Sequence, residues 1–198
     1  MRAHLRLLGI IPLLLFFAHL LYHYYQGSPE NMLWICHLAN LLFGFGLLFN
    51  NATLVRTSTI WIIVGFPLWI MDMVVTGEFA VTSLLSHTGG LIIGLVALAR
   101  IRTVRHSWVY AFIGGLIAQQ LTRIITPREL NVNIAHKIYN GWEGIFVYYW
   151  QYWIFISIMA AFWLWLTGAL LARLFPPEKA LHKKEDYAKR DRTSPQTA

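Results

Sequence analysis

The chain has few charged residues and a single cysteine. Charged residues make up 13% of its 198 residues, about half the share that is usual in soluble globular proteins. Cys36 is the one cysteine, which excludes an intramolecular disulfide and any metal site built from several cysteines. A composition this poor in charge does not fit an ordinary soluble domain.

Apolar residues fill the chain instead, at 57% of the sequence with a mean hydropathy of +0.52. A spanning helix needs about 20 mostly apolar residues, and six stretches are candidates: 5–25, 32–49, 59–77, 79–99, 107–125 and 147–175. The first exceeds a signal-peptide core in length and lacks a small-residue cleavage site, so we expect it to be retained. The sequence predicts an all-α membrane protein, with a six-helix transmembrane domain over residues 1–177.

Lysine and arginine residues are distributed unevenly between the two ends of these stretches. If the N-terminus is cytoplasmic, the inside segments carry Arg2, Arg6, Arg56, Arg100, Arg102, Arg105, Arg173, Lys179, Lys183, Lys184, Lys189, Arg190 and Arg192. The outside segments carry only Arg123, Arg128 and Lys137. Positive residues concentrate in cytoplasmic segments, so we expect both termini inside, in a multi-pass protein of the cell inner (plasma) membrane.

The net charge of +7 does not indicate a nucleic-acid partner. The basic residues lie in connections and near the C-terminus rather than in a stripe interleaved with aromatic residues. Residues 178–198 are charged and have no periodic apolar face, so we expect a disordered basic cytosolic tail. The predicted surroundings are membrane lipids, which are also candidate substrates; oligomerisation stays open.

One predicted helix carries a packing pattern. Ser86, Gly90 and Gly94 are spaced four residues apart on one face of the 79–99 stretch. Small residues at this spacing let another membrane helix approach closely. The pattern predicts tight packing on this face and says nothing of chemistry.

Several polar residues fall inside the predicted spans, where ionisable groups are costly and commonly mark functional sites. They are His19, His23, Cys36, His37, Asn40, Asp72, His87, Gln119 and Gln120. In the expected orientation most lie in the outer half of their helices, at the level of Arg123, Asn131 and Asn133. We therefore expect one outward-facing polar pocket formed by His19, His23, Asn40, Asp72, Arg123, Asn131 and Asn133 around the reactive residues. Separate interhelical hydrogen bonds are the alternative.

Cys36 and a histidine could together perform acyl transfer, in which a thiolate attacks an ester carbonyl. Adjacent helix residues point about 100° apart, so His37 is not the obvious base for Cys36, and His87 from another helix is better placed. Asn40 or Arg123 would hold the oxyanion. This chemistry requires no cofactor and no metal.

The segments WICHLAN at 34–40 and LSHTGG at 85–90, with NVN at 131–133, resemble the bacterial YwaF-like integral membrane proteins. That family is related to eukaryotic transmembrane phospholipid acyltransferases and to the androgen-induced fatty-acid-ester hydrolases. The resemblance implies a six-helix fold with lipid-acyl chemistry and places the catalytic histidine at His87. The nucleophile would be Cys36 or a close neighbour, near His37. This chain departs from the bacterial pattern at Ala39, where relatives often have a cysteine.

Other interpretations remain open. Cys36 could be inert packing, His19 and His23 could be interfacial, and Asp72 could be a structural partner of Arg123 or of a histidine. The alternative functions are a non-catalytic membrane protein, a small transporter that uses histidines and Asp72 as relay groups, and a redox protein whose intramembrane histidines bind haem or a metal.

Overall fold

The computed structural model describes residues 3–101, 104 and 106–176, and these form helices joined by turns and loops, with no strand among them. The α-helices are α1 (Ala3–Leu7), α2 (Ile10–Tyr25), α3 (Ile35–Leu48), α4 (Ala52–Thr76), α5 (Val81–Leu98), α6 (Ser107–Ile125) and α7 (Tyr149–Leu174). Two short 3-10 helices, η1 (Pro29–Leu33) and η2 (Val132–Ile134), lie in the connections. The tail expected at 178–198 lies outside the described residues.

The long helices have the composition of membrane-spanning segments. Four are long and apolar enough to cross a bilayer: His4–Tyr25, which joins α1 and α2, and α4, α5 and α7, with mean hydropathies of 1.7 to 2.1. Large apolar side chains are exposed along these helices, and an exposed apolar surface of this extent suits lipid better than water. The prediction of an all-α protein with apolar helices long enough to span a membrane is confirmed.

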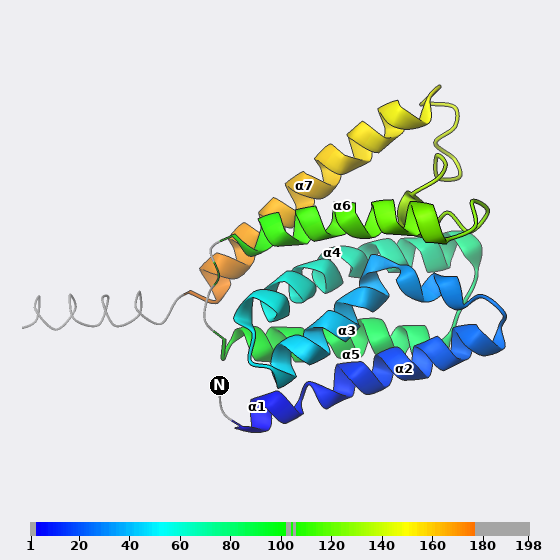
Figure 1. The fold of residues 1–198 in the computed structure, drawn as a ribbon. Helices are drawn as coiled ribbons and strands as arrows, with labels where there is room; N and C mark the ends of the chain where they lie inside the picture. The colour runs from blue at the N-terminus through cyan, green and yellow to red at the C-terminus, as the bar shows by residue number, and fades with distance from the viewer. Residues whose placement is uncertain (1–2, 102–103, 105, 177–198) are drawn as a thin grey trace, which may run out of the picture.

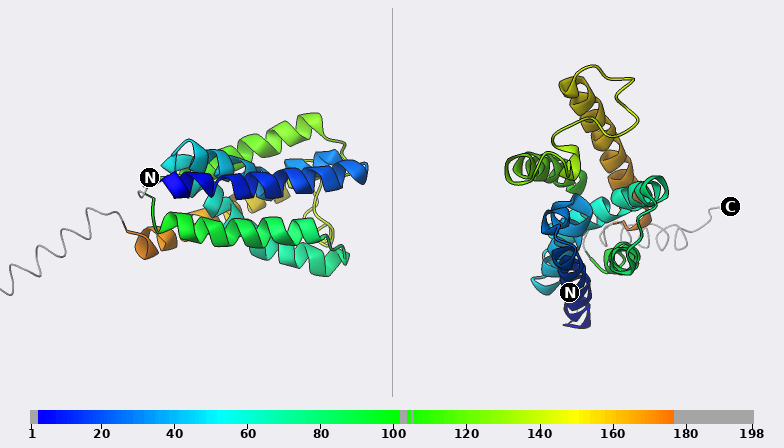
Figure 2. Two further views of the ribbon diagram at one scale, coloured as in Figure 1. Left: turned by 90° about the horizontal axis from the view of Figure 1, so that it is seen from below. Right: turned by 90° about the vertical axis from the view of Figure 1, so that its right-hand side faces the viewer.

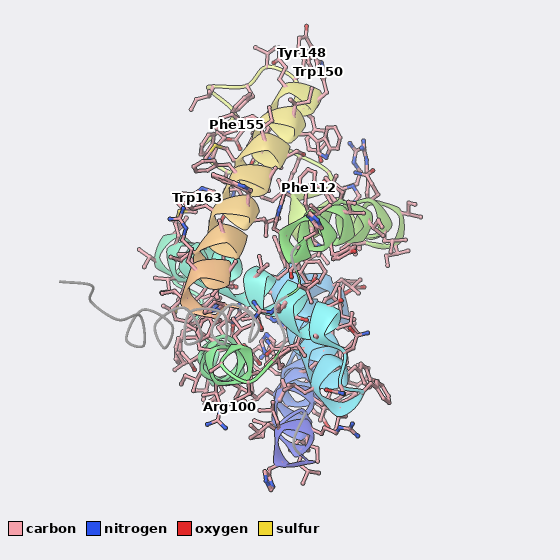
Figure 3. All side chains as sticks on the ribbon, turned by 90° about the vertical axis from the view of Figure 1, so that its left-hand side faces the viewer. Arg100, Phe112, Tyr148, Trp150, Phe155 and Trp163 are labelled. Carbon is pink, nitrogen blue, oxygen red and sulfur yellow. The ribbon has the colours of Figure 1, made fainter. Side chains whose placement is uncertain are left out.

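From α2 onward, successive α-helices run in opposite directions, so the connections gather at the two ends of the bundle (Figure 1). Helix α4 contacts α3, α5, α6 and α7. Seen along the helices, it lies between the pair α6 and α7 and the group α2, α3 and α5 (Figure 2, right). The Tyr149 end of α7 leans away from α6 (Figure 1), and Trp150, Phe155 and Trp163 project outward from this helix (Figure 3).

Two predicted helix starts are wrong. Helix α4 begins at Ala52 rather than residue 59, with the Asn51 side chain accepting a hydrogen bond from the Leu54 amide at its N-terminus. The start was missed because the first turns of α4 contain polar residues, which are typical of a connection. Among them is Arg56, which was expected in a cytoplasmic connection but is buried in the helix, where its guanidinium donates to the carbonyls of Ile101 and Phe175 at 3.2 and 3.5 Å.

The stretch predicted to be helical from residue 32 begins its α-helix only at Ile35. Pro29 starts the 3-10 helix η1, and Trp34 has φ −58° and ψ 137°, which separates η1 from α3. Proline fixes its own φ and lacks an amide donor, so it commonly opens a new helical turn. Cys36 and His37 therefore lie in the first turn of α3.

The small residues of α5 lie at close helix contacts, as their spacing predicted. A Cβ atom added to Gly90 would stand 2.5 Å from Oδ1 of Asn40 on α3, and one added to Gly94 would stand 2.9 Å from Cγ2 of Thr59 on α4. The Ser86 hydroxyl donates to the carbonyl of Leu15 on α2 at 3.3 Å. This face of α5 thus sets its distance from three neighbouring helices.

We predict that Gly90→Ala destabilises the protein by about 1–3 kcal/mol, the usual effect of forcing an extra carbon into a packed interior. Thermal unfolding of the purified protein in detergent would measure the loss as a lower Tm. Gly144→Ala is the matched control, because a Cβ atom at Gly144 meets nothing within 4 Å. Equal melting temperatures for the two variants would contradict the close contact at Gly90.

Candidate histidine cluster

Four histidines from three helices form one cluster. His19 and His23 come from successive turns of α2, His37 from the first turn of α3, and His87 from the second turn of α5. The ring centroids are 4.6 Å apart for His19 and His23, 4.5 Å for His19 and His37, 5.5 Å for His37 and His87, and 6.2 Å for His23 and His37. Residues that lie up to 68 positions apart in the sequence are thus brought together.

The rings are largely buried. His19 and His87 are 2% exposed and His37 is 7% exposed, whereas His23, at the end of α2, is half-buried. Among apolar helices, buried polar groups need partners within the protein. The hydrogen bonds of the rings therefore decide what the cluster can do.

The start of α5 holds two of the rings. Nδ1 of His19 lies 2.8 Å from the Thr82 hydroxyl, and Nδ1 of His87 lies 2.9 Å from the Ser83 carbonyl oxygen. A carbonyl oxygen only accepts, so Nδ1 of His87 carries the proton and Nε2 has the free lone pair. The indole of Trp69 on α4 stacks on the His87 ring with centroids 4.5 Å apart. His87 is thereby held in one tautomer and one orientation.

Two ring nitrogens are buried without a hydrogen-bond partner among the described residues. They are Nδ1 of His37 and Nε2 of His87. Such atoms are few in native proteins, and each needs a physical explanation. Both belong to this cluster, which marks it as a place where a substrate, water or ion would be stabilised.

Cys36 lies beside two of the histidines. Its Sγ atom and one ring nitrogen each of His37 and His87 are all within 4.8 Å of one another. One ring nitrogen each of His19, His23 and His37 are likewise within 4.8 Å of one another. His37 therefore belongs to both groups, and it lies closer to Cys36 than the angle between neighbouring helix residues suggested.

Asn40 links α3 to α5, and its amide has no free hydrogen left for the reactive groups. Its Nδ2 atom donates to the carbonyls of Cys36 and Ser86, both at 3.3 Å, which uses both amide hydrogens. Its Oδ1 atom is buried without a partner in the described part of the chain. The expectation that Asn40 donates to an oxyanion is not supported by this geometry.

Asp72 and Arg123 have partners outside the histidine cluster. Asp72 is exposed near the end of α4 and accepts a 2.6 Å hydrogen bond from the Tyr139 hydroxyl. This bond, with partial burial, raises the pKa of Tyr139 to about 12. Arg123 is exposed, and its guanidinium carbon lies 5.5 Å from the centroid of the Tyr149 ring. Arg123 thus makes a cation–π contact, and Asp72 is paired with Tyr139 rather than with Arg123 or a histidine, the partners that the alternative interpretation gave it.

Asn131 and Asn133 shape the long connection between α6 and α7. Both adopt positive φ, 47° and 54°, a conformation that asparagine tolerates better than most residues. The Asn131 side chain closes a local turn by accepting from the amides of His136 and Lys137. Asn133 reaches further, accepting from the Ile35 amide at 2.9 Å and donating to the Leu33 carbonyl at 2.8 Å. It thereby fixes the start of α3, next to Cys36 and His37.

This connection is in turn held by α6 and α7. Nε2 of Gln119 donates to the Asn133 carbonyl at 3.1 Å, and Oε1 of Gln119 accepts from the Trp153 indole at 2.7 Å. The Tyr149 hydroxyl donates to the Ile134 carbonyl at 2.9 Å. Of the two predicted glutamines, Gln119 is buried and Gln120 is exposed. The middle of the connection is therefore a structural clamp on α3.

Sequence reasoning missed Thr82, Ser83 and Trp69. The only sequence signal was the spacing of Ser83 and His87, four residues apart on one helix face. Trp69 had none, because a tryptophan in an apolar helix is most simply read as lipid-facing or packing.

Comparisons of the chain with protein-family models, with curated proteins and with solved structures find no match. The geometry of the histidine cluster is thus the basis for a functional argument.

We predict that Asn133→Ala destabilises the protein by about 2–4 kcal/mol, because it removes two partly buried hydrogen bonds and places alanine at positive φ. Thermal unfolding in detergent would measure this loss, and hydrogen exchange would show faster exchange over residues 33–37. Asn133→Gly relieves the backbone strain and should lose less. The exposed Asn140→Ala is the control. Unchanged exchange at the start of α3 in Asn133→Ala would contradict the clamp.

Proposed function

We propose that the protein crosses the cell inner (plasma) membrane six times with both termini in the cytoplasm, and that it cleaves or transfers an acyl group of a membrane lipid ester. Cys36 is the nucleophile and His87 is the base in this proposal. The observation that carries it is the placement of the Cys36 sulfur within 4.8 Å of a His87 ring nitrogen. The bond from His87 to the Ser83 carbonyl meanwhile orients the ring.

The reaction would begin with transfer of the Cys36 thiol proton to Nε2 of His87, which has the free lone pair. The thiolate attacks the ester carbonyl carbon, a C–S bond forms, and the carbonyl oxygen takes up the electron pair. When the tetrahedral intermediate collapses, the C–O bond of the lipid breaks and its oxygen receives the proton from His87. Cys36 is left as a thioester.

The second half of the reaction releases the acyl chain. Water, or the hydroxyl of a second lipid, attacks the thioester carbonyl while His87 accepts its proton. The C–S bond then breaks, and the proton returns to the Cys36 sulfur. Water as the acceptor gives a hydrolase, and a lipid hydroxyl gives an acyltransferase. In both cases the Ser83 carbonyl orients His87, the part that a carboxylate plays in many Ser-His-Asp triads.

The positions of the two motifs also support membership of the YwaF-like family, which we propose with the activity. Cys36 lies in the segment 34–40 and His87 in the segment 85–90, and the fold brings both into one cluster. The NVN segment at 131–133 holds α3 through Asn133. All three segments that carry the resemblance thus meet around the start of α3.

Six crossings fit the arrangement of the helices. The 14 residues of α3 span only about 21 Å. The 3-10 helix η1 directly precedes α3 in the chain and adds to the length of this crossing (Figure 1). Helix α6 has 19 residues, enough for about 28 Å. With alternating helix directions, the start of α1 and the end of α7 lie at one end of the bundle (Figure 1). The excess of lysine and arginine assigns that end to the cytoplasm.

The transporter alternative has less support. It uses Asp72 as a relay group inside the membrane, whereas Asp72 is exposed and bonded to Tyr139 in the connection after α6. No second polar side chain joins Asp72 to the histidines through a hydrogen bond within the described ranges. The following experiment distinguishes the proposed enzyme from a non-catalytic membrane protein.

We predict that Cys36→Ala and His87→Ala each lower the hydrolysis of a fluorogenic phospholipid ester at least about 100-fold, the usual contribution of a nucleophile or base. The full-length protein would be assayed in lipid nanodiscs. A labelled acyl group should be trapped on wild-type protein and released by neutral hydroxylamine, which cleaves thioesters.

The control for this assay is His106→Ala, since His106 is exposed at the start of α6 and lies away from the cluster. It should hydrolyse the ester at the wild-type rate. Equal rates in the wild-type, Cys36→Ala and His87→Ala proteins would remove the acyl chemistry and leave the non-catalytic alternative.

The topology can be tested with single cysteines in a Cys36→Ser background, because the chain has no other cysteine. Glu78→Cys and Asn140→Cys lie in exposed connections at one end of the bundle, and Ala99→Cys is exposed at the other. On intact cells, a membrane-impermeant maleimide should label the first two, and Ala99→Cys only after permeabilisation. The reverse pattern would invert the orientation, and labelling of all three would rule out the alternating crossings.

A further inference from the structure

We propose that His19, His23 and His37 form a binding site for a divalent first-row transition-metal ion. One ring nitrogen from each residue lies within 4.8 Å of those of the other two. These three side chains, here called the histidine triad, come from α2 and α3. The site goes beyond the acyl chemistry proposed above, because neither Cys36 nor His87 is one of its ligands.

The donor set has the chemistry of a metal site. Imidazole nitrogens bind zinc, copper, iron and nickel well. His19 and His23 are four residues apart and share one face of α2, and their rings lie 4.6 Å apart. His37 completes the set from the facing helix, with its ring 4.5 Å from that of His19. Two ligands on one helix and a third on its neighbour would join α2 to α3.

The outer hydrogen bonds leave ring nitrogens free for a metal. Nδ1 of His19 lies 2.8 Å from the Thr82 hydroxyl, and Nδ1 of His23 lies 3.5 Å from the Ser28 hydroxyl. Metal-binding histidines usually bond through their other nitrogen in this way, which fixes the ring and its tautomer. Both Nε2 atoms are then available as ligands.

His37 provides the most direct evidence that the histidine triad could bind a cation. Its side chain is more than nine-tenths buried, and its Nδ1 atom has no hydrogen-bond partner among the described residues. Edge-to-face packing with the His19 ring accounts for where the ring lies but leaves this nitrogen unsatisfied. A bound cation would satisfy it, as it would the lone pairs of its two neighbours.

The distances permit this with small side-chain movements. Nitrogen atoms bound tetrahedrally at about 2.0–2.1 Å lie about 3.3 Å from each other. To bind one ion at this spacing, the rings would turn about χ2, a torsion with a broad range in histidine, so that the separations of up to 4.8 Å shorten.

Three protein ligands leave an open coordination position, as in catalytic zinc sites. His37 also belongs to the group with Cys36 and His87, so the metal would lie beside the proposed nucleophile and base. There it would polarise the carbonyl oxygen of an ester, a task for which Asn40 has no free donor. This role rests on the proposed function, whereas the binding site itself does not.

The experiment titrates full-length protein in nanodiscs with Co²⁺, after purification on a tag free of histidine and removal of metals with a chelator. We expect one Co²⁺ per chain, with the visible absorption of a nitrogen-bound tetrahedral ion, displaced by Zn²⁺. His19→Ala, His23→Ala and His37→Ala should each weaken binding at least about 100-fold, and Thr82→Val about 10-fold, through the hydrogen bond to His19. His106→Ala and His136→Ala should bind Co²⁺ like the wild type.

Three results would overturn the site: no Co²⁺ absorption, equal binding by the triad variants and the wild type, or a sulfur-to-cobalt charge-transfer band that Cys36→Ala abolishes. The last would make Cys36 a ligand and also remove it as a free nucleophile. His23 is half-buried at the end of α2, so His23→Ala and Thr82→Val decide the question if His37→Ala does not fold. Ester hydrolysis on the same samples tests the acyl chemistry separately. Metal binding without ester hydrolysis would refute the acyl chemistry and leave the metal site standing.

Discussion

A polar group buried among apolar helices cannot bond to bulk water, so leaving it without a partner costs free energy. That constraint governs the centre of this bundle. Asn40 donates hydrogen bonds to carbonyls on α3 and α5. Asn133, which lies about a hundred residues further along the sequence in the connection between α6 and α7, bonds to the backbone groups of Leu33 and Ile35. These bonds determine where α3 begins and how closely it approaches α5. The histidine cluster occupies the space that remains between these elements and α2.

Contacts from several other elements therefore meet at the start of α3. Gln119 and Tyr149 hold the connection that contains Asn133, which transmits the packing of α6 and α7 to α3. At the same level, the first turns of α5 orient His19 and His87 through Thr82 and Ser83. A site with such supports is held from several sides, which suits groups that must keep a defined geometry.

Where one physical signal dominated, the sequence predicted the long helices and pointed to the four histidines that the fold brings together. Apolar runs marked the long helices, and the cost of histidines in lipid singled out His19, His23, His37 and His87. The start of α4 was missed because Thr53, Arg56 and Ser58 look like a connection, whereas in the fold Arg56 reaches backbone carbonyls of two other segments. Asp72 and Arg123 were assigned to the pocket by depth alone. Depth says nothing of the direction in which a side chain points, and the partners of both lie elsewhere.

The shared position of His37 has a consequence for how the cluster would work. Its ring lies 4.5 Å from that of His19 and 5.5 Å from that of His87, so it contacts histidines of both α2 and α5 at this level. Any displacement of α3 would change both sets of distances together, since Cys36 and His37 are adjacent on its first turn. Hydrogen bonds and metal–ligand bonds tolerate errors of only a few tenths of an ångström. Gly90 permits the close contact of α3 with α5, and Asn133 fixes the start of α3, so two residues outside the cluster set the precision of both groups within it.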